Sequence, residues 1–110
     1  MKLDEDQLRQ FKDEGYIVVP DLFSAEEVAI MKGEIPSIFT ENRPVVWREK
    51  NGKAARTAFA THIYNEVFRR FVRHPHILDP AEQMLSGQVY VHQFKLNGKA
   101  AFDGDVSQWH

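Results

Sequence analysis

The N-terminal part of the chain has apolar positions at the spacing of two short helices, each with its own start signal. Asp4 is followed three residues later by Gln7, and Gly15 comes after the last apolar position, so we predict a capped amphipathic helix over residues 4–14. A Ser-Ala-Glu-Glu capping box predicts that a second helix begins at Ser24. Both signals are local and require no knowledge of the rest of the fold.

The residues around these helices carry further expectations. The β-branched and aromatic run at 16–19, stopped by a proline, is typical of a short buried strand. In the second helix we expect Val28, Ile30 and Met31 to face the core. Pro36 should end or kink that helix, because proline lacks the backbone N–H of the helical ladder.

The middle of the chain changes from strand-like to helix-like periodicity. Residues 44–49 and 54–59 are rich in strand formers and flank the Asn-Gly pair at 51–52, which favours a tight turn, so we predict a β-hairpin. From Thr61 onward the aromatic and apolar positions recur at helical spacing. This predicted helix should end before Pro75.

The last third is predicted to contain one short helix and one long strand. The helix begins at Pro80 and is stopped by Gly87, and residues 88–97 are strand formers without a helix signal. Taken together, the elements predict an α+β fold that forms one domain over residues 1–110.

Alternation along the last strand collects polar side chains on one face. An amide, an ammonium group and a second amide share that face: Gln93, Lys95 and Asn97. This row could bind a small carboxylate, although a solvent-exposed face of an antiparallel sheet has the same pattern. On the opposite face we interpret His92 as a buried, hydrogen-bonded histidine.

Composition and charge exclude several classes of function. The 14 Lys and Arg residues against 16 Asp and Glu residues give a formal net charge of -2, too balanced to drive nucleic-acid binding. No apolar run approaches the roughly 20 residues that a bilayer crossing needs, and no signal peptide is recognisable, so we expect a cytoplasmic protein without a membrane partner. Because the chain has no cysteine, any metal chemistry must use histidines and carboxylates.

Two other short patterns have simple structural interpretations. We interpret Pro75, between His74 and His76, as a helix boundary flanked by exposed imidazoles rather than as the centre of a metal pair. The Asp-Gly-Asp sequence at 103–105 lacks the further acidic positions of a calcium loop and is interpreted as a turn.

The C-terminal segment carries the most specific motif. Residues 90–110, YVHQFKLNGKAAFDGDVSQWH, resemble the stretch that leads to the iron site in the phytanoyl-CoA dioxygenase family, close to its ectoine-hydroxylase-like bacterial branch. That family has a His-Gln-x-Arg/Lys-x-Asn strand, a glycine-containing loop and a Trp-His-x-Asp motif. The segments 15–19 and 22–27 are also similar to the start of such proteins, so the resemblance covers nearly the whole chain.

The resemblance implies a non-haem iron(II) enzyme on a double-stranded β-helix, which uses 2-oxoglutarate and O2 to hydroxylate a small polar metabolite such as an amino acid or a related compound. By matching positions, His110 is the first metal ligand, Lys95 and Asn97 are 2-oxoglutarate-binding residues, and Gln93 contacts the substrate. The chain then looks like the truncated N-terminal portion of a larger jelly-roll domain. We expect this portion alone to be inactive and, with an open sheet edge, prone to form homo-oligomers.

Two alternatives stay open at this point. One histidine cannot hold catalytic iron, so a domain that owns only these 110 residues would be a non-catalytic α+β binding or interaction module. The third reading is an iron and 2-oxoglutarate halogenase, in which a small residue replaces the carboxylate ligand and chloride fills the position. The residue that separates these enzymes would stand two positions after His110.

Overall fold

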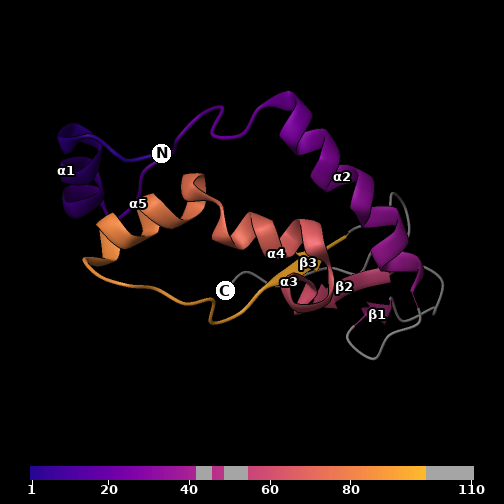
Figure 1. The fold of residues 1–110 in the computed structure, drawn as a ribbon. Helices are drawn as coiled ribbons and strands as arrows, with labels where there is room; N and C mark the ends of the chain where they lie inside the picture. The colour runs from indigo at the N-terminus through magenta and orange to yellow at the C-terminus, as the bar shows by residue number, and fades with distance from the viewer. Residues whose placement is uncertain (42–45, 49–54, 99–110) are drawn as a thin grey trace.

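The computed structural model describes residues 1–41, 46–48 and 55–98. Within these ranges the chain forms an α+β fold (Figure 1). The helices are α1 (Glu5–Glu14), α2 (Ala25–Thr40), α3 (Thr61–Tyr64), α4 (Glu66–Arg73) and α5 (Pro75–Leu85). The strands are β1 (Val46–Arg48), β2 (Ala55–Phe59) and β3 (Lys95–Asn97).

The strands form one antiparallel sheet in the order β1-β2-β3. The pairing of β1 with β2 confirms the predicted hairpin, while its Asn-Gly pair at 51–52 lies outside the described residues. In the pairing of β2 with β3, Thr57 stands opposite Asn97 and Phe59 stands opposite Lys95. The central strand therefore sets the register of the strand that carries the predicted polar face.

The core lies where α2 and α4 meet the sheet. Ile38, Ala58 and Phe68 are buried and come from α2, β2 and α4 respectively. Partly buried apolar side chains surround them: Met31, Ile35, Phe39, Phe71, Phe94 and Leu96. Both helices lie above the sheet in Figure 1, so this small core joins the helical and strand parts of the chain.

The N-terminal segment docks on α5. The Leu3 backbone N–H donates to Gln83 Oε1 at 2.7 Å, and Gln83 Nε2 donates to the Leu3 carbonyl at 3.1 Å. The terminal ammonium of Met1 lies 3.4 Å from Asp79. These contacts place α1 beside α5 (Figure 1), although the two helices are far apart in sequence.

The predicted helix caps are confirmed. Asp4 and Gln7 form a complete capping box at the start of α1, and Gly15 ends this helix in the left-handed region with a φ of 84°. Ser24 and Glu27 form a complete capping box at the start of α2. Such caps satisfy backbone groups that the helix itself leaves unpaired, which explains why the pattern identifies them without tertiary information.

Pro36 does not end α2, so the first of its two predicted effects is absent. The helix continues through it to Thr40. Ile38, two residues further on, is only 1% exposed, and its burial holds the last turn of the helix in place. The expected inward face is also partly wrong, because Val28 and Ile30 are exposed and only Met31 packs against the core.

The buried strand predicted at 16–19 is not present. This segment has no strand assignment, and the Val18 side chain is 75% exposed. A strand requires a neighbour to complete its hydrogen-bond ladder. Among the described residues, no other strand pairs with this segment.

The second half of the chain confirms the element types and corrects their limits. The helical pattern from Thr61 divides into α3 and α4 at Asn65, whose side chain caps α4. Helix α5 begins at Pro75 rather than Pro80, because proline is tolerated at the first helical position and His74 caps the helix. The long strand predicted over 88–97 shrinks to β3, which is ordered as a strand only opposite β2.

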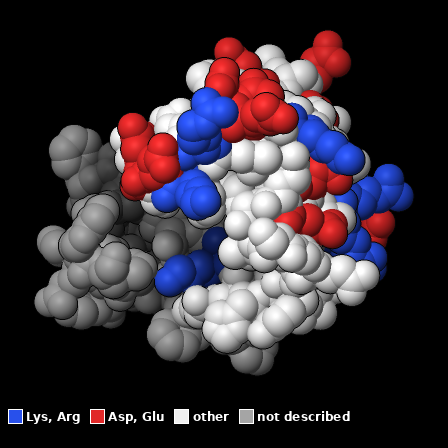
Figure 2. All heavy atoms as spheres, turned by 90° about the vertical axis from the view of Figure 1, so that its left-hand side faces the viewer, with Lys and Arg blue, Asp and Glu red and all other residues white. Residues whose placement is uncertain are grey.

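The described surface carries acidic and basic side chains together. Figure 2 shows both kinds intermingled on the face that includes α1 and α5, in agreement with the near-zero net charge. Within the described ranges, none of the helices combines the length and hydrophobicity that a bilayer crossing requires.

Candidate functional site

Two of the three polar side chains predicted to form a row on the last strand lie on one exposed face of β3. Lys95 and Asn97 are exposed, and Leu96 between them packs against the core. The two side chains therefore share the face of β3 that is turned away from the core. Among the described residues, no carboxylate lies within ion-pair distance of the Lys95 ammonium group.

A cross-strand hydrogen bond orients Asn97. The hydroxyl of Thr57, on β2, donates to Asn97 Oδ1 at 3.0 Å. Because the amide oxygen accepts this bond, the amide nitrogen is the end of Asn97 that can donate to a bound anion. An ammonium group and an amide donor on one strand face are suited to a small carboxylate.

Gln93 lies just before β3 and is exposed. It lines a pocket of about 910 Å³ between the helices and the extended segment before β3, together with Tyr90 and Phe94. His92 is also exposed, so the prediction of a buried histidine is wrong. The extended segment departs from strand geometry there, and the alternation read from the sequence does not reach back to His92.

Two predicted features lie outside the described residues. These are His110, the metal ligand implied by the family resemblance, and the Asp-Gly-Asp turn at 103–105. The structure thus brings Lys95 and Asn97 together on β3 and places Gln93 next to them in the chain.

A second group of chemically active side chains lies at the junction of α2, α4 and α5. Glu27, His74 and His76 each offer a ligand atom, and these atoms lie within 4.8 Å of one another. All three side chains are half-buried, so the expectation of exposed imidazoles is wrong for His74 and His76. Sequence reasoning missed this group because Glu27 arrives from a distant helix.

Hydrogen bonds hold Glu27 and His74 in place. Glu27 Oε1 accepts the backbone N–H of Ser24 at 2.9 Å, and Glu27 Oε2 lies 3.4 Å from His74 Nε2. His74 Nδ1 accepts the backbone N–H of His76 at 3.0 Å and so caps α5. The Ser24 N–H bond is the main reason that the pKa of Glu27 lies below its ordinary value, and the neighbouring imidazoles act in the same direction.

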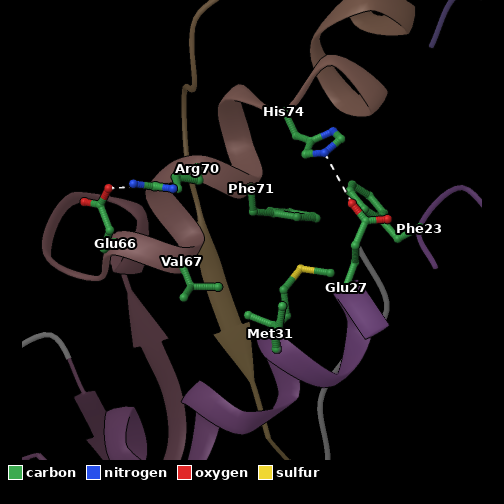
Figure 3. Close-up of a pocket in the computed structure, with 9 residues that line it drawn as sticks. Phe23, Glu27, Met31, Glu66, Val67, Arg70, Phe71 and His74 are labelled. Atoms are coloured by element: carbon green, nitrogen blue, oxygen red, sulfur yellow. Dashed lines mark hydrogen bonds and ion pairs between the residues drawn. The ribbon is translucent and has the colours of Figure 1, made fainter. Parts of the chain in front are cut away.

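A pocket of about 440 Å³ lies beside this group (Figure 3). Its walls are mostly apolar and include Phe71. Glu66 pairs with Arg70 at 3.0 Å on one side of the pocket, and Glu27 lies 3.4 Å from His74 on the other. The hydrogen bond from Arg70 is the main cause that lowers the pKa of Glu66.

Comparison with known proteins identifies curated relatives that are enzymes. The chain is 34% identical over 113 residues to an ectoine dioxygenase from Bordetella parapertussis, and the matched region covers 98% of this chain and 36% of that protein. It is 38% identical over 97 residues to an L-proline trans-4-hydroxylase from Streptomyces griseoviridis, covering 88% of this chain and 36% of that protein. The chain therefore spans little more than a third of the length of these relatives.

Solved structures and a family match agree with these relatives. The crystal structure of EctD from S. alaskensis with bound Fe matches with a TM-score of 0.87 and 29% identity, over 98% of this chain and 40% of that chain. The structure of the same protein with 2-oxoglutarate and 5-hydroxyectoine matches with a TM-score of 0.82 and 29% identity, over 93% and 38% of the two chains. The family described as Phytanoyl-CoA dioxygenase (PhyH) matches residues 11–110. The chain belongs to the phytanoyl-CoA dioxygenase family.

Proposed function

We propose that the protein is an iron(II)- and 2-oxoglutarate-dependent dioxygenase that hydroxylates a small polar metabolite, such as an amino acid or a related compound. Residues 1–110 then form the N-terminal portion of a larger jelly-roll domain. Family membership and relatives that act on ectoine or L-proline support this proposal.

The observation that carries the proposal is the exposed face of β3. Lys95 and Asn97 share this face, and the Thr57 hydrogen bond leaves the amide nitrogen of Asn97 as the donor. A dicarboxylate such as 2-oxoglutarate presents oxygens that both groups can bind: the ammonium group supplies charge and the amide supplies direction. The donor chemistry on β3 thus fits the co-substrate.

The remaining roles follow from the matched motif. His110 is the proposed first iron ligand, and Gln93, which lines the larger pocket, is the proposed substrate contact. Bound iron would supply the activation of O2 that is coupled to oxidation of 2-oxoglutarate to succinate. The residues of this chain would hold the 2-oxoglutarate carboxylate and orient the substrate beside it.

The shape and surface of the chain support its assignment to a larger domain. A compact domain of this length has a radius of gyration of about 13 Å, whereas this chain has 16.3 Å. Large apolar side chains are exposed as well, including Val18 at 75% and Tyr90 at 84%. Further strands of a jelly roll would cover such surface.

The test is an oxygenase assay on the polypeptide that carries this chain and its continuation. With Fe(II), 2-oxoglutarate and O2, we expect succinate to form together with a hydroxylated product, and ectoine and L-proline are the first substrates to offer. A chlorinated product in the presence of chloride would instead identify a halogenase. Absence of both succinate and 2-oxoglutarate binding would contradict the proposal and favour a non-catalytic module.

A further inference from the structure

The group formed by Glu27, His74 and His76 has the composition of a divalent metal site. It offers two imidazoles and one carboxylate, a ligand set that proteins use for zinc together with bound water. The group uses none of the residues assigned above to iron or 2-oxoglutarate. Of the residues that the structure describes, these three are the ones whose ligand atoms converge in this way.

The distances fit a small cation. Ligand atoms about 2.1 Å from a tetrahedral zinc ion lie roughly 3.4 Å from one another. Glu27 Oε2 and His74 Nε2 are already 3.4 Å apart, and the ligand atoms of all three residues are within 4.8 Å. Closing the group around an ion therefore requires only a small movement of side chains, mainly that of His76.

The surroundings hold the group in place and leave one nitrogen of His76 without a partner. Glu27 is anchored through its other oxygen by the Ser24 N–H bond, so Oε2 keeps its direction toward His74. The Phe23 ring packs against both imidazoles, with centroid separations of 5.1 Å and 5.5 Å. His76 Nδ1 is buried and has no hydrogen-bond partner, so this side chain has an unused nitrogen.

Helix ends of both kinds meet at this junction: the N-terminal ends of α2, whose first turn carries Glu27, and of α5 oppose a cation, whereas the C-terminal end of α4 favours one. His74 follows the last residue of α4 and precedes α5. The carboxylate of Glu27 then supplies the net attraction for a divalent ion.

We infer that Glu27, His74 and His76 form a second divalent metal site, selective for zinc-like ions, that links α2 to the junction of α4 and α5. Binding through His74 Nε2 displaces the proton from this nitrogen, and Nδ1 then carries the ring proton. The cap bond that Nδ1 accepts from His76 is lost at the same time. One neutral hydrogen bond is a small loss beside two or three metal–ligand bonds.

The first test is a titration with Zn²⁺ by isothermal calorimetry of the polypeptide that carries this chain and its continuation, with Fe(II) and 2-oxoglutarate already bound. Glu27→Gln keeps the capping box, because glutamine serves in it as well as glutamate, and His74→Asn keeps a strong N-cap residue at the start of α5. We expect each substitution to weaken binding by at least the roughly 10–100-fold that loss of a group supporting a ligand costs, since each removes the ligand itself. The matched control is His92→Asn, which removes an exposed histidine outside the group and should leave the affinity unchanged.

A spectroscopic readout on the unaltered chain makes the result independent of variant folding. Long-range ¹H–¹⁵N spectra should show the His74 ring proton moving from Nε2 to Nδ1 when Zn²⁺ is added, with a matching shift at His76. Unchanged affinity in Glu27→Gln, an equal loss in His92→Asn, or a His74 ring that keeps its Nε2 proton would each overturn the inference. None of these outcomes bears on 2-oxoglutarate turnover, so the two proposals fail separately.

Discussion

The exposed face of β3 and the helix junction around Glu27 present two kinds of polar site in one small chain. On β3, Lys95 and Asn97 are two positions apart on one element, and the strand alone sets their relative position. At the junction, Glu27 meets His74 only because α2 and α4 pack against each other. The first site depends on local geometry and the second on the core.

The largest expected effect comes from breaking the core that joins the two regions. Ile38→Ala removes the most buried apolar side chain of α2 and should lower the free energy of unfolding by about 2–5 kcal/mol. Chemical denaturation followed by circular dichroism measures this loss. Ile30→Ala, in the same helix and 61% exposed, is the control and should change stability by less than about 1 kcal/mol. Equal losses would contradict the described core.

Removing the ammonium group on β3 should affect only the first region. In the polypeptide that carries this chain and its continuation, Lys95→Met should raise the KM for 2-oxoglutarate by about tenfold or more, because a hydrogen bond to a charged group is lost. Lys95→Arg should restore part of the affinity. Lys12→Met, an exposed lysine on α1, is the matched control. An unchanged KM in Lys95→Met would show that Lys95 does not bind 2-oxoglutarate.

Removing the α2 cap tests the stability of the helix junction rather than that of the β3 face. Ser24→Ala removes the hydroxyl that accepts the Glu27 N–H at 3.1 Å, and should destabilise the chain by about 1 kcal/mol. Ser37→Ala, at an exposed position inside the same helix, should have little effect. Thermal unfolding compares the two variants, and equal melting temperatures would mean that the capping box contributes no stability.

The smallest expected effect concerns the pKa of Glu66, which lies across the 440 Å³ pocket from Glu27. The pKa of Glu66 is lowered, mainly by Arg70, so their interaction is fully present above the ordinary value of 4.5 and is lost as the pH falls through the lowered pKa. A ¹³C NMR titration should therefore place the midpoint of Glu66 below 4.5. Arg70→Gln should move it upward, whereas Arg9→Gln, on α1, should not.

Local signals in the sequence predicted correctly where α1 and α2 begin and that Lys95 and Asn97 share one face of β3. The capping boxes at Asp4 and Ser24 depend on residues three positions apart, and alternation placed Lys95 and Asn97 on one face. These features follow from hydrogen bonds between near neighbours and from strand alternation, which explains why they could be found without the structure.

Features set by tertiary packing could not be predicted. The run containing Val18 has strand-like residues but no strand beside it among the described residues. Helix α2 continues past Pro36 because Ile38, two residues later, is buried in the core. The approach of Glu27 to His74 and His76 follows from helix packing. No spacing pattern in the sequence indicates this contact between residues of separate helices.

The most direct test of the account is an anaerobic crystal structure of the longer polypeptide with Fe(II) and 2-oxoglutarate. We predict that a carboxylate of 2-oxoglutarate lies within hydrogen-bond distance of the Lys95 ammonium group or the Asn97 amide, with iron bound to His110. A structure in which 2-oxoglutarate binds away from β3, or in which His110 does not hold the iron, would contradict the proposed site.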